Sequence, residues 1–211
     1  MKKESQVIFD KNVIEFVTVA AEFCAFLERA ESMKRSTFVD TTLKILPLLY
    51  LKASMLPKCE MIGDESPETY VTEEIYEVLR INLVSILAEK DDYLEVFLPD
   101  MAYSDEPIKK NISEDLADIY QDIKDFIFVF QLGLNETMND SLAICQENFG
   151  LLWGQKLVNT MRALHDVKYS PKARGEDEEE EEYEPENNED CHCEDDDCHC
   201  HDHGCHCHDD E

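Results

Sequence analysis

The sequence predicts an all-α protein, a helical bundle of about five helices followed by a disordered, acidic C-terminal tail rich in cysteine and histidine. Two observations carry this prediction. Through residues 1–170, apolar residues recur at steps of three and four, the spacing of one buried helix face, and no run of alternating β-branched residues suggests a sheet. From Gly175 onward no aliphatic residue occurs and like charges are dense, so this part cannot bury enough surface to offset the entropy of ordering.

Five segments show the helical pattern. They are residues 12–29, residues 37–55, residues 72–88, a fourth that starts at Asn111 or Ser113 and stops near Gly133, and residues 138–165. The second is apolar on nearly all sides, which favours a place in the middle of the bundle. Pro47 should kink or break it, because proline lacks the N–H that a helix interior uses.

Three stretches carry signals beyond the helical pattern. Asn111 and Ser113 are suited to capping the fourth helix. On the fifth, Gly150 and Gly154 indicate either the close approach of another helix or a kink. Residues 91–110 break the periodicity, and we expect an ordered crossover there that has room for a short extra helix.

The charge is strongly negative and unevenly spread. Of the 49 acidic residues, 19 follow Ser170 against two basic ones, which leaves 30 acidic and 17 basic residues before it. This balance argues against nucleic acid and anionic membranes as partners, and it favours cations, basic protein surfaces or plain solubility. The sequence shows no signal peptide and no apolar stretch long enough to span a membrane, so we expect a soluble, cytoplasmic protein.

Some stretches of the helical part are distinctive together. The run at residues 111–125, NISEDLADIYQDIKD, is followed by WGQ from Trp153 and by MRALH ending at His165. With these motifs the chain, over roughly residues 9–165, resembles an uncharacterised bacterial helical family known only as a domain of unknown function. The resemblance implies the helical fold and brings no catalytic or binding residues with it. The cysteine- and histidine-rich tail lies outside it.

Residues 1–170 show no catalytic constellation, so we do not expect an enzyme and expect no cofactor there. His165 suits a cationic place at a helix C-terminus. Four aspartates follow the fourth helix at steps of three and four: Asp115, Asp118, Asp122 and Asp125. We interpret them as a solvated face; the alternative is a patch for a basic partner or divalent cations.

The candidate metal-binding side chains are concentrated after residue 190. Cys-His-Cys occurs three times with a period of seven, and residues 191–211 contain six of the nine cysteines and six of the seven histidines. The candidate ligands are Cys191, His192, Cys193, Cys198, His199, Cys200, His201, His203, Cys205, His206, Cys207 and His208. In an extended chain, residues i and i+2 point the same way, so the two cysteines of one repeat can grip one ion. Thiolate and imidazole select Zn(II) first, with Ni(II) or Cu(I) as alternatives, and tetrahedral sites would cap the load at about three ions.

The predicted organisation is therefore a helical domain (1–170), an acidic disordered linker (171–190) and a metal-binding tail (191–211). The first hypothesis is an accessory protein whose core binds a protein partner and whose tail buffers or delivers transition-metal ions. The alternative is a helical adaptor in which the tail is only a solubilising or redox-sensitive extension. Composition also leaves open a purification tag.

Overall fold

The computed structural model describes residues 7–95 and 108–170 of the 211-residue chain. These residues form a bundle of helices and one short β-hairpin. The elements are η1 (Val7–Phe9), α1 (Lys11–Glu28), η2 (Ala30–Ser32), α2 (Arg35–Ser54), α3 (Glu73–Leu87), η3 (Ala88–Lys90), β1 (Asp92–Leu94), β2 (Lys109–Asn111), α4 (Ile112–Gln131), α5 (Asn135–Asn148), η5 (Phe149–Trp153) and α6 (Gly154–Tyr169). The predicted all-α class and the five predicted helical segments are confirmed, since α5, η5 and α6 follow one another without a break.

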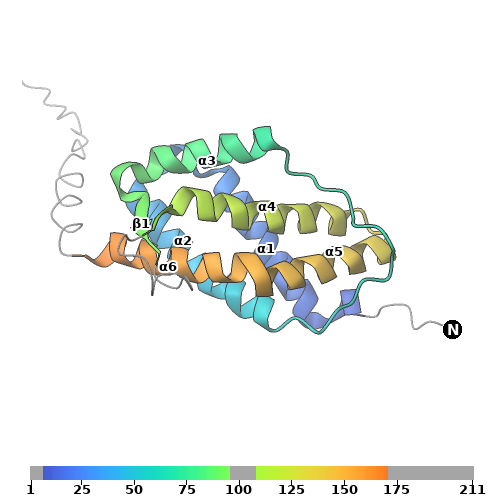
Figure 1. Cartoon of the computed structure of the whole chain (residues 1–211). Coiled ribbons are helices and arrows are strands. Elements are labelled where there is room, and N and C mark those ends of the chain that lie inside the picture. Colours follow the sequence, from blue (N-terminus) through green and yellow to red (C-terminus); the bar gives the residue numbers. More distant parts are fainter. Residues whose placement is uncertain (1–6, 96–107, 171–211) are drawn as a thin grey trace, which may run out of the picture.

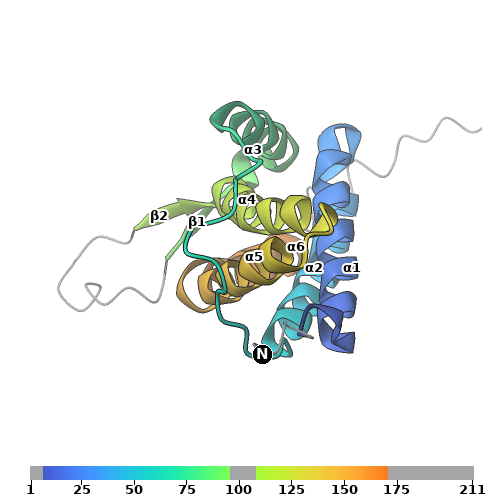
Figure 2. The same cartoon turned by 90° about the vertical axis from the view of Figure 1, so that its right-hand side faces the viewer.

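The centre of the bundle is α4, which packs against α1, α3, α5 and α6 (Figures 1 and 2). The prediction that the second helix lies in the middle is wrong. On α2 only one face is buried, with Leu46 and Leu49 in the core, whereas Leu48 and Leu51 are 44% and 50% exposed. Pro47 lies on the exposed side and does not break the helix. An apolar composition on all sides therefore did not translate into burial on all sides.

The long C-terminal helix changes its winding where the sequence has its two glycines. Five residues, Phe149–Trp153, form a π-helical turn between α5 and α6. A Cβ atom on Gly154 would lie 2.3 Å from the carbonyl oxygen of Phe149, whereas nothing lies within 4 Å of one on Gly150. Gly154 thus permits a close approach, but to the preceding turn of its own helix and not to another helix. π-helical turns of this kind occur frequently at functional sites.

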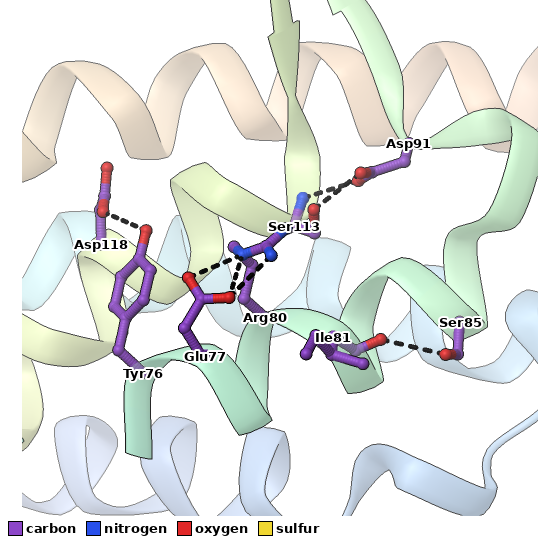
Figure 3. A network of polar contacts seen from close by, with 8 residues as sticks. All are labelled: Tyr76, Glu77, Arg80, Ile81, Ser85, Asp91, Ser113 and Asp118. Carbon is purple, nitrogen blue, oxygen red and sulfur yellow. Dashed lines mark hydrogen bonds and ion pairs between the residues drawn. The ribbon is translucent and has the colours of Figure 1, made fainter. Parts of the chain in front are cut away.

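The start of α4 depends on Asp91, a buried aspartate from the preceding segment. Its carboxylate accepts hydrogen bonds from the backbone N–H and the hydroxyl of Ser113, both at 2.7 Å (Figure 3). Asn111 stands at the N-cap position, as predicted, but neither its side chain nor that of Ser113 caps the helix with a hydrogen bond. Here a carboxylate distant in sequence supplies the acceptor that an N-cap side chain usually provides.

The hairpin formed by β1 and β2 was not expected. Its strands pair antiparallel, with Asp92 opposite Asn111 and Leu94 opposite Lys109. Three residues in each strand give no readable alternation of apolar and polar side chains, which is why the sequence did not indicate it. Gly133, in contrast, ends α4 as predicted and adopts a φ of 76°, a conformation that glycine tolerates best.

Between α2 and α3 the chain has no helix or strand and crosses the ends of α4 and α5 (Figure 2). We call residues 56–71 the strap. Asp140 on α5 holds its middle, accepting from the backbone N–H of Ile62 at 2.7 Å and of Gly63 at 2.8 Å. Gln146 on α5 holds its beginning, accepting from the N–H of Cys59 at 3.0 Å. Side chains of α5 thus supply the acceptors that regular secondary structure would otherwise provide.

Several predictions fall on residues outside the described ranges. They are the short helix expected within the crossover, insofar as it concerns residues 96–107, the acidic linker 171–190 and the metal-binding tail 191–211. In the described part of the chain, no helix is both long and apolar enough to cross a membrane.

Candidate functional site

A cavity of about 440 Å³ lies where one face of α4 meets one face of α5, η5 and α6, with the strap along its edge. Its lining comes from three stretches of the chain. The strap gives Pro67, Glu68 and Thr69; α4 gives Asp118, Gln121, Asp122, Asp125, Phe126 and Val129; the long C-terminal helix gives Ser141, Ile144, Cys145, Asn148, Leu152 and Lys156. The volume is within the range typical of small-molecule sites.

Asp122 and Asp125 stand on the same face of α4, less than one turn apart, and both line this cavity. Asn148 donates to Oδ1 of Asp122 at 2.6 Å. The backbone N–H groups of Tyr70 and Val71 donate to Oδ1 of Asp125, both at 2.7 Å. Each carboxylate therefore uses one oxygen for structure, while its Oδ2 receives no hydrogen bond from the described residues.

Both carboxylates are partly withdrawn from water. Burial raises the pKa of Asp122, against the lowering effect of the hydrogen bond from Asn148, and the negative charges of Asp125 and Asp118 raise it further. Burial likewise raises the pKa of Asp125, although the two N–H donors act in the opposite direction. The charged forms are thus less favourable here than in water, and a cation in the cavity would compensate for them.

Asp118, one turn before Asp122, already has partners within the fold. It accepts a hydrogen bond from the hydroxyl of Tyr76 on α3 at 2.8 Å (Figure 3), and it forms an ion pair with Lys156. Among the described lining residues, Lys156 is the one basic side chain, and the Glu68 carboxylate on the strap forms no ion pair within residues 7–95 and 108–170. With Asp118 and Lys156 paired, Glu68, Asp122 and Asp125 leave the cavity with a net charge of about −3 when ionised.

The inner wall of the cavity is apolar. Phe126, Val129 and Cys145 are 2%, 3% and 2% exposed, respectively. Burial raises the pKa of the Cys145 thiol well above its ordinary value, so this side chain is neutral. Its backbone carbonyl accepts a hydrogen bond of 3.1 Å from the indole N–H of Trp153, the single tryptophan of the chain.

The aspartates of α4 are not the solvated face that the sequence suggested. Asp115 is 4% exposed and accepts a short hydrogen bond from the hydroxyl of Tyr93 on β1. The other three are partly buried and hydrogen-bonded. The spacing showed that they share a face of α4, but the sequence did not show that tyrosines, an asparagine and the strap cover that face.

None of the twelve predicted metal ligands, Cys191 to His208, lies within the described ranges. The metal site of the tail therefore stays a prediction. Over residues 7–95 and 108–170, no group of three or more His, Cys, Asp or Glu side chains is placed to hold a metal ion. Cys24 and Cys145 are buried, and Cys59 is half-buried, with its thiol 3.3 Å from the Asn139 side-chain oxygen. His165, in the last turns of α6, is exposed and packs its ring against Tyr169.

Sequence reasoning missed the cavity because its wall is assembled from distant segments. One signal was available: on α4, Asp118, Asp122 and Asp125 recur at helical spacing directly beside Phe126 and Val129. An acidic stripe that borders an apolar one is also typical of an ordinary amphipathic helix. The strap residues and Lys156, which complete the site, carry no local pattern that would link them to α4.

The protein is a helical bundle with the strap packed along one edge of a cavity, and this cavity has acidic side chains and an apolar inner wall. The chain belongs to the DUF5063 family, a domain of unknown function, whose model matches residues 7–170. This confirms the resemblance noted from the sequence. The chain is similar to the protein BF1032 of Bacteroides fragilis, a solved crystal structure, with 92% identity and a TM-score of 0.73 over 80% of this chain and 99% of that one. No curated protein matches the chain.

Proposed function

We propose that this DUF5063 protein is a non-enzymatic accessory protein that binds soft metal ions through residues 191–211 and a protein partner through its helical domain. The observation that carries the proposal is the triple Cys-His-Cys repeat with its period of seven. Four ligands per tetrahedral ion set a limit of about three ions, with Zn(II) first and Ni(II) or Cu(I) as alternatives. Such a tail would serve to buffer or deliver metal.

The helical domain supports this division of labour. Its three cysteines are buried or half-buried and are well separated along the chain, and the described residues bring together no metal-binding group. The soft ligands of the protein are therefore concentrated in the tail. The acidic residues around the tail repeats raise the local cation concentration and disfavour free thiolates, so binding should release protons and weaken as the pH falls.

The test is metal binding by the full-length reduced protein. We expect Zn(II) to bind more tightly than micromolar with up to about three ions per chain. Replacing the six tail cysteines by serine should abolish this binding, whereas replacing Cys24, Cys59 and Cys145 by serine or alanine in a folded variant should leave it intact. Affinity no better than micromolar for Zn(II), Ni(II) and Cu(I) would refute the proposal.

A second candidate, a helical adaptor with a dispensable tail, is favoured by one specific observation. The match with the Bacteroides fragilis structure takes in 99% of that chain but 80% of this one, about the extent of the helical domain. Affinity capture with the full-length protein and with a chain ending at Ser170, each with and without chelator, distinguishes the two. Partners that depend on neither tail nor metal support the adaptor if the tail also binds no metal ion more tightly than micromolar.

A further inference from the structure

We propose that the cavity between α4, the strap and the long C-terminal helix binds an alkylammonium group, the end of an aliphatic amine or of a lysine side chain. The proposal is independent of metal binding by the tail, because it concerns other residues and another class of ligand. It assigns to the helical domain a ligand chemistry of its own. Three features of the cavity support this ligand: its negative charge, its free carboxylate oxygens and its apolar inner wall.

Charge selects a cation. Glu68, Asp122 and Asp125 line the cavity and form no ion pair with any residue that the structure describes. Lys156 is paired with Asp118, and its attraction for Asp122 is the weakest of the influences on that carboxylate. An anion would have to enter beside three carboxylates. Like charges repel each other more strongly in a partly desolvated site than in water. Burying uncompensated carboxylates is costly, so a protein gains by having the cavity filled with positive charge.

The free acceptors select a hydrogen-bonding cation. Oδ2 of Asp122 and Oδ2 of Asp125 receive no hydrogen bond from the described residues, because the structural donors use Oδ1 in both cases. An ammonium group has three donors that can point in different directions. It can therefore bridge two carboxylates that lie less than one turn apart on one helix face, which gives charge-assisted hydrogen bonds.

The apolar inner wall of the cavity favours an organic cation over a metal ion. Phe126, Val129 and Cys145 are almost completely buried and present carbon and a neutral thiol to the cavity. A divalent ion needs several converging oxygen ligands, and the described carboxylates form no such group. An aliphatic stem, in contrast, can cover this apolar wall while its charged end reaches the carboxylates, as lysine side chains do on protein surfaces.

The test uses the full-length, metal-free protein and two probes that separate the sources of the group. 1,5-Diaminopentane represents a free amine, and Nα-acetyl-lysine methylamide represents a lysine side chain in a peptide. Binding is measured by calorimetry and by the fluorescence of Trp153, which is the only tryptophan and is hydrogen-bonded to the cavity residue Cys145. Trp153 is fully buried, so its fluorescence reports on the surroundings of the cavity.

We expect saturable binding of at least one probe, and a loss of affinity of about tenfold or more in Asp122→Asn, because one charge-assisted hydrogen bond is lost. The matched control is Glu22→Gln, which makes the same change of charge at an exposed position on α1 and should have no effect. 1-Pentanol, which has a similar stem without the charge, should not bind.

Three results overturn the proposal. They are an absence of saturable binding by both probes at millimolar concentration, equal loss of affinity in Asp122→Asn and Glu22→Gln, and binding of 1-pentanol as tight as that of the amines. Circular dichroism establishes that both variants are folded. Asp122→Asn retains an oxygen to accept the hydrogen bond from Asn148, so a loss of binding in a folded variant is attributable to the charge.

Discussion

Asp91, Asp125 and Asp140 each accept at least two hydrogen bonds from residues that lie far from them in sequence. Asp91 binds the first turn of α4, and the other two bind the strap. The first turn of α4 and the strap both contain backbone N–H groups that have no partner within a helix or strand. A carboxylate accepts from these N–H groups, which would otherwise be left without a partner. At the scale of single residues, the fold of this acidic protein depends on where a few carboxylates face inward.

Asp91→Ala should destabilise the protein by about 2–3 kcal/mol. The substitution leaves the N–H and the hydroxyl of Ser113 without their acceptor, in a place where both are buried, and buried unsatisfied donors carry a cost of this order. The measurement is urea unfolding followed by circular dichroism. Asp92→Ala is the matched control, because that carboxylate is exposed and pairs with Lys109; its loss should cost less than about 1 kcal/mol. Equal losses would contradict the role given to Asp91.

Asp122→Asn should stabilise the protein at neutral pH by about 0.5 kcal/mol. Burial and the neighbouring charges of Asp125 and Asp118 raise the pKa of Asp122 in the folded state, so the folded chain binds this proton more tightly than the unfolded chain. The cost of ionising Asp122 is therefore absent below about pH 3.8 and develops as the pH rises through the raised pKa. Urea unfolding at a series of pH values tests this; a gain that is largest at acidic pH would have the wrong sign.

At the scale of elements, sequence periodicity was a reliable guide to which segments are helical and a poor guide to how they pack. The helix over residues 11–28 and the one over residues 73–87 agree with prediction to within about one residue, because each buries one face only. For α2, apolar residues on all sides gave no preferred face, and its central place was wrongly inferred. Asp91, the strap and the cavity depend on contacts between residues 20 to 90 positions apart, for which a single sequence contains no local signal.

Gly154→Ala and Gly150→Ala should have opposite effects although they lie one turn apart. A Cβ at position 154 would lie 2.3 Å from the Phe149 carbonyl oxygen, so the π-helical turn must distort, and we expect a loss of about 2 kcal/mol. At position 150 a Cβ meets nothing within 4 Å, and alanine should gain up to about 1 kcal/mol from its helix propensity. Thermal and urea unfolding of the two variants provide the comparison. Similar effects of the two substitutions would mean that the π-helical turn does not require a glycine.

At the scale of the whole molecule, the acidic residues form two sets, to which we assign different roles. In the helical domain, carboxylates are fixed by named partners and surround a cavity of defined shape. After Ser170, 19 acidic residues are set among the cysteines and histidines and the spacer before them, with hardly any apolar residue to bury. The proposed functions follow this division, with a shaped site for an organic cation in one part and adaptable soft-metal ligands in the other. Binding in the two parts should therefore be energetically independent.

Zinc binding should leave the melting temperature of the helical domain unchanged. A ligand raises the stability of a folded domain only if it binds the folded state better than the unfolded one, and the predicted tail sites are built from residues close together in sequence, which are equally available in both states. Scanning calorimetry of the full-length protein with zinc and with chelator should give the same transition, and a chain ending at Ser170 should give it too. If zinc instead raises the transition of the full-length protein alone, the metal-loaded tail packs against the helical domain, and the two parts are coupled.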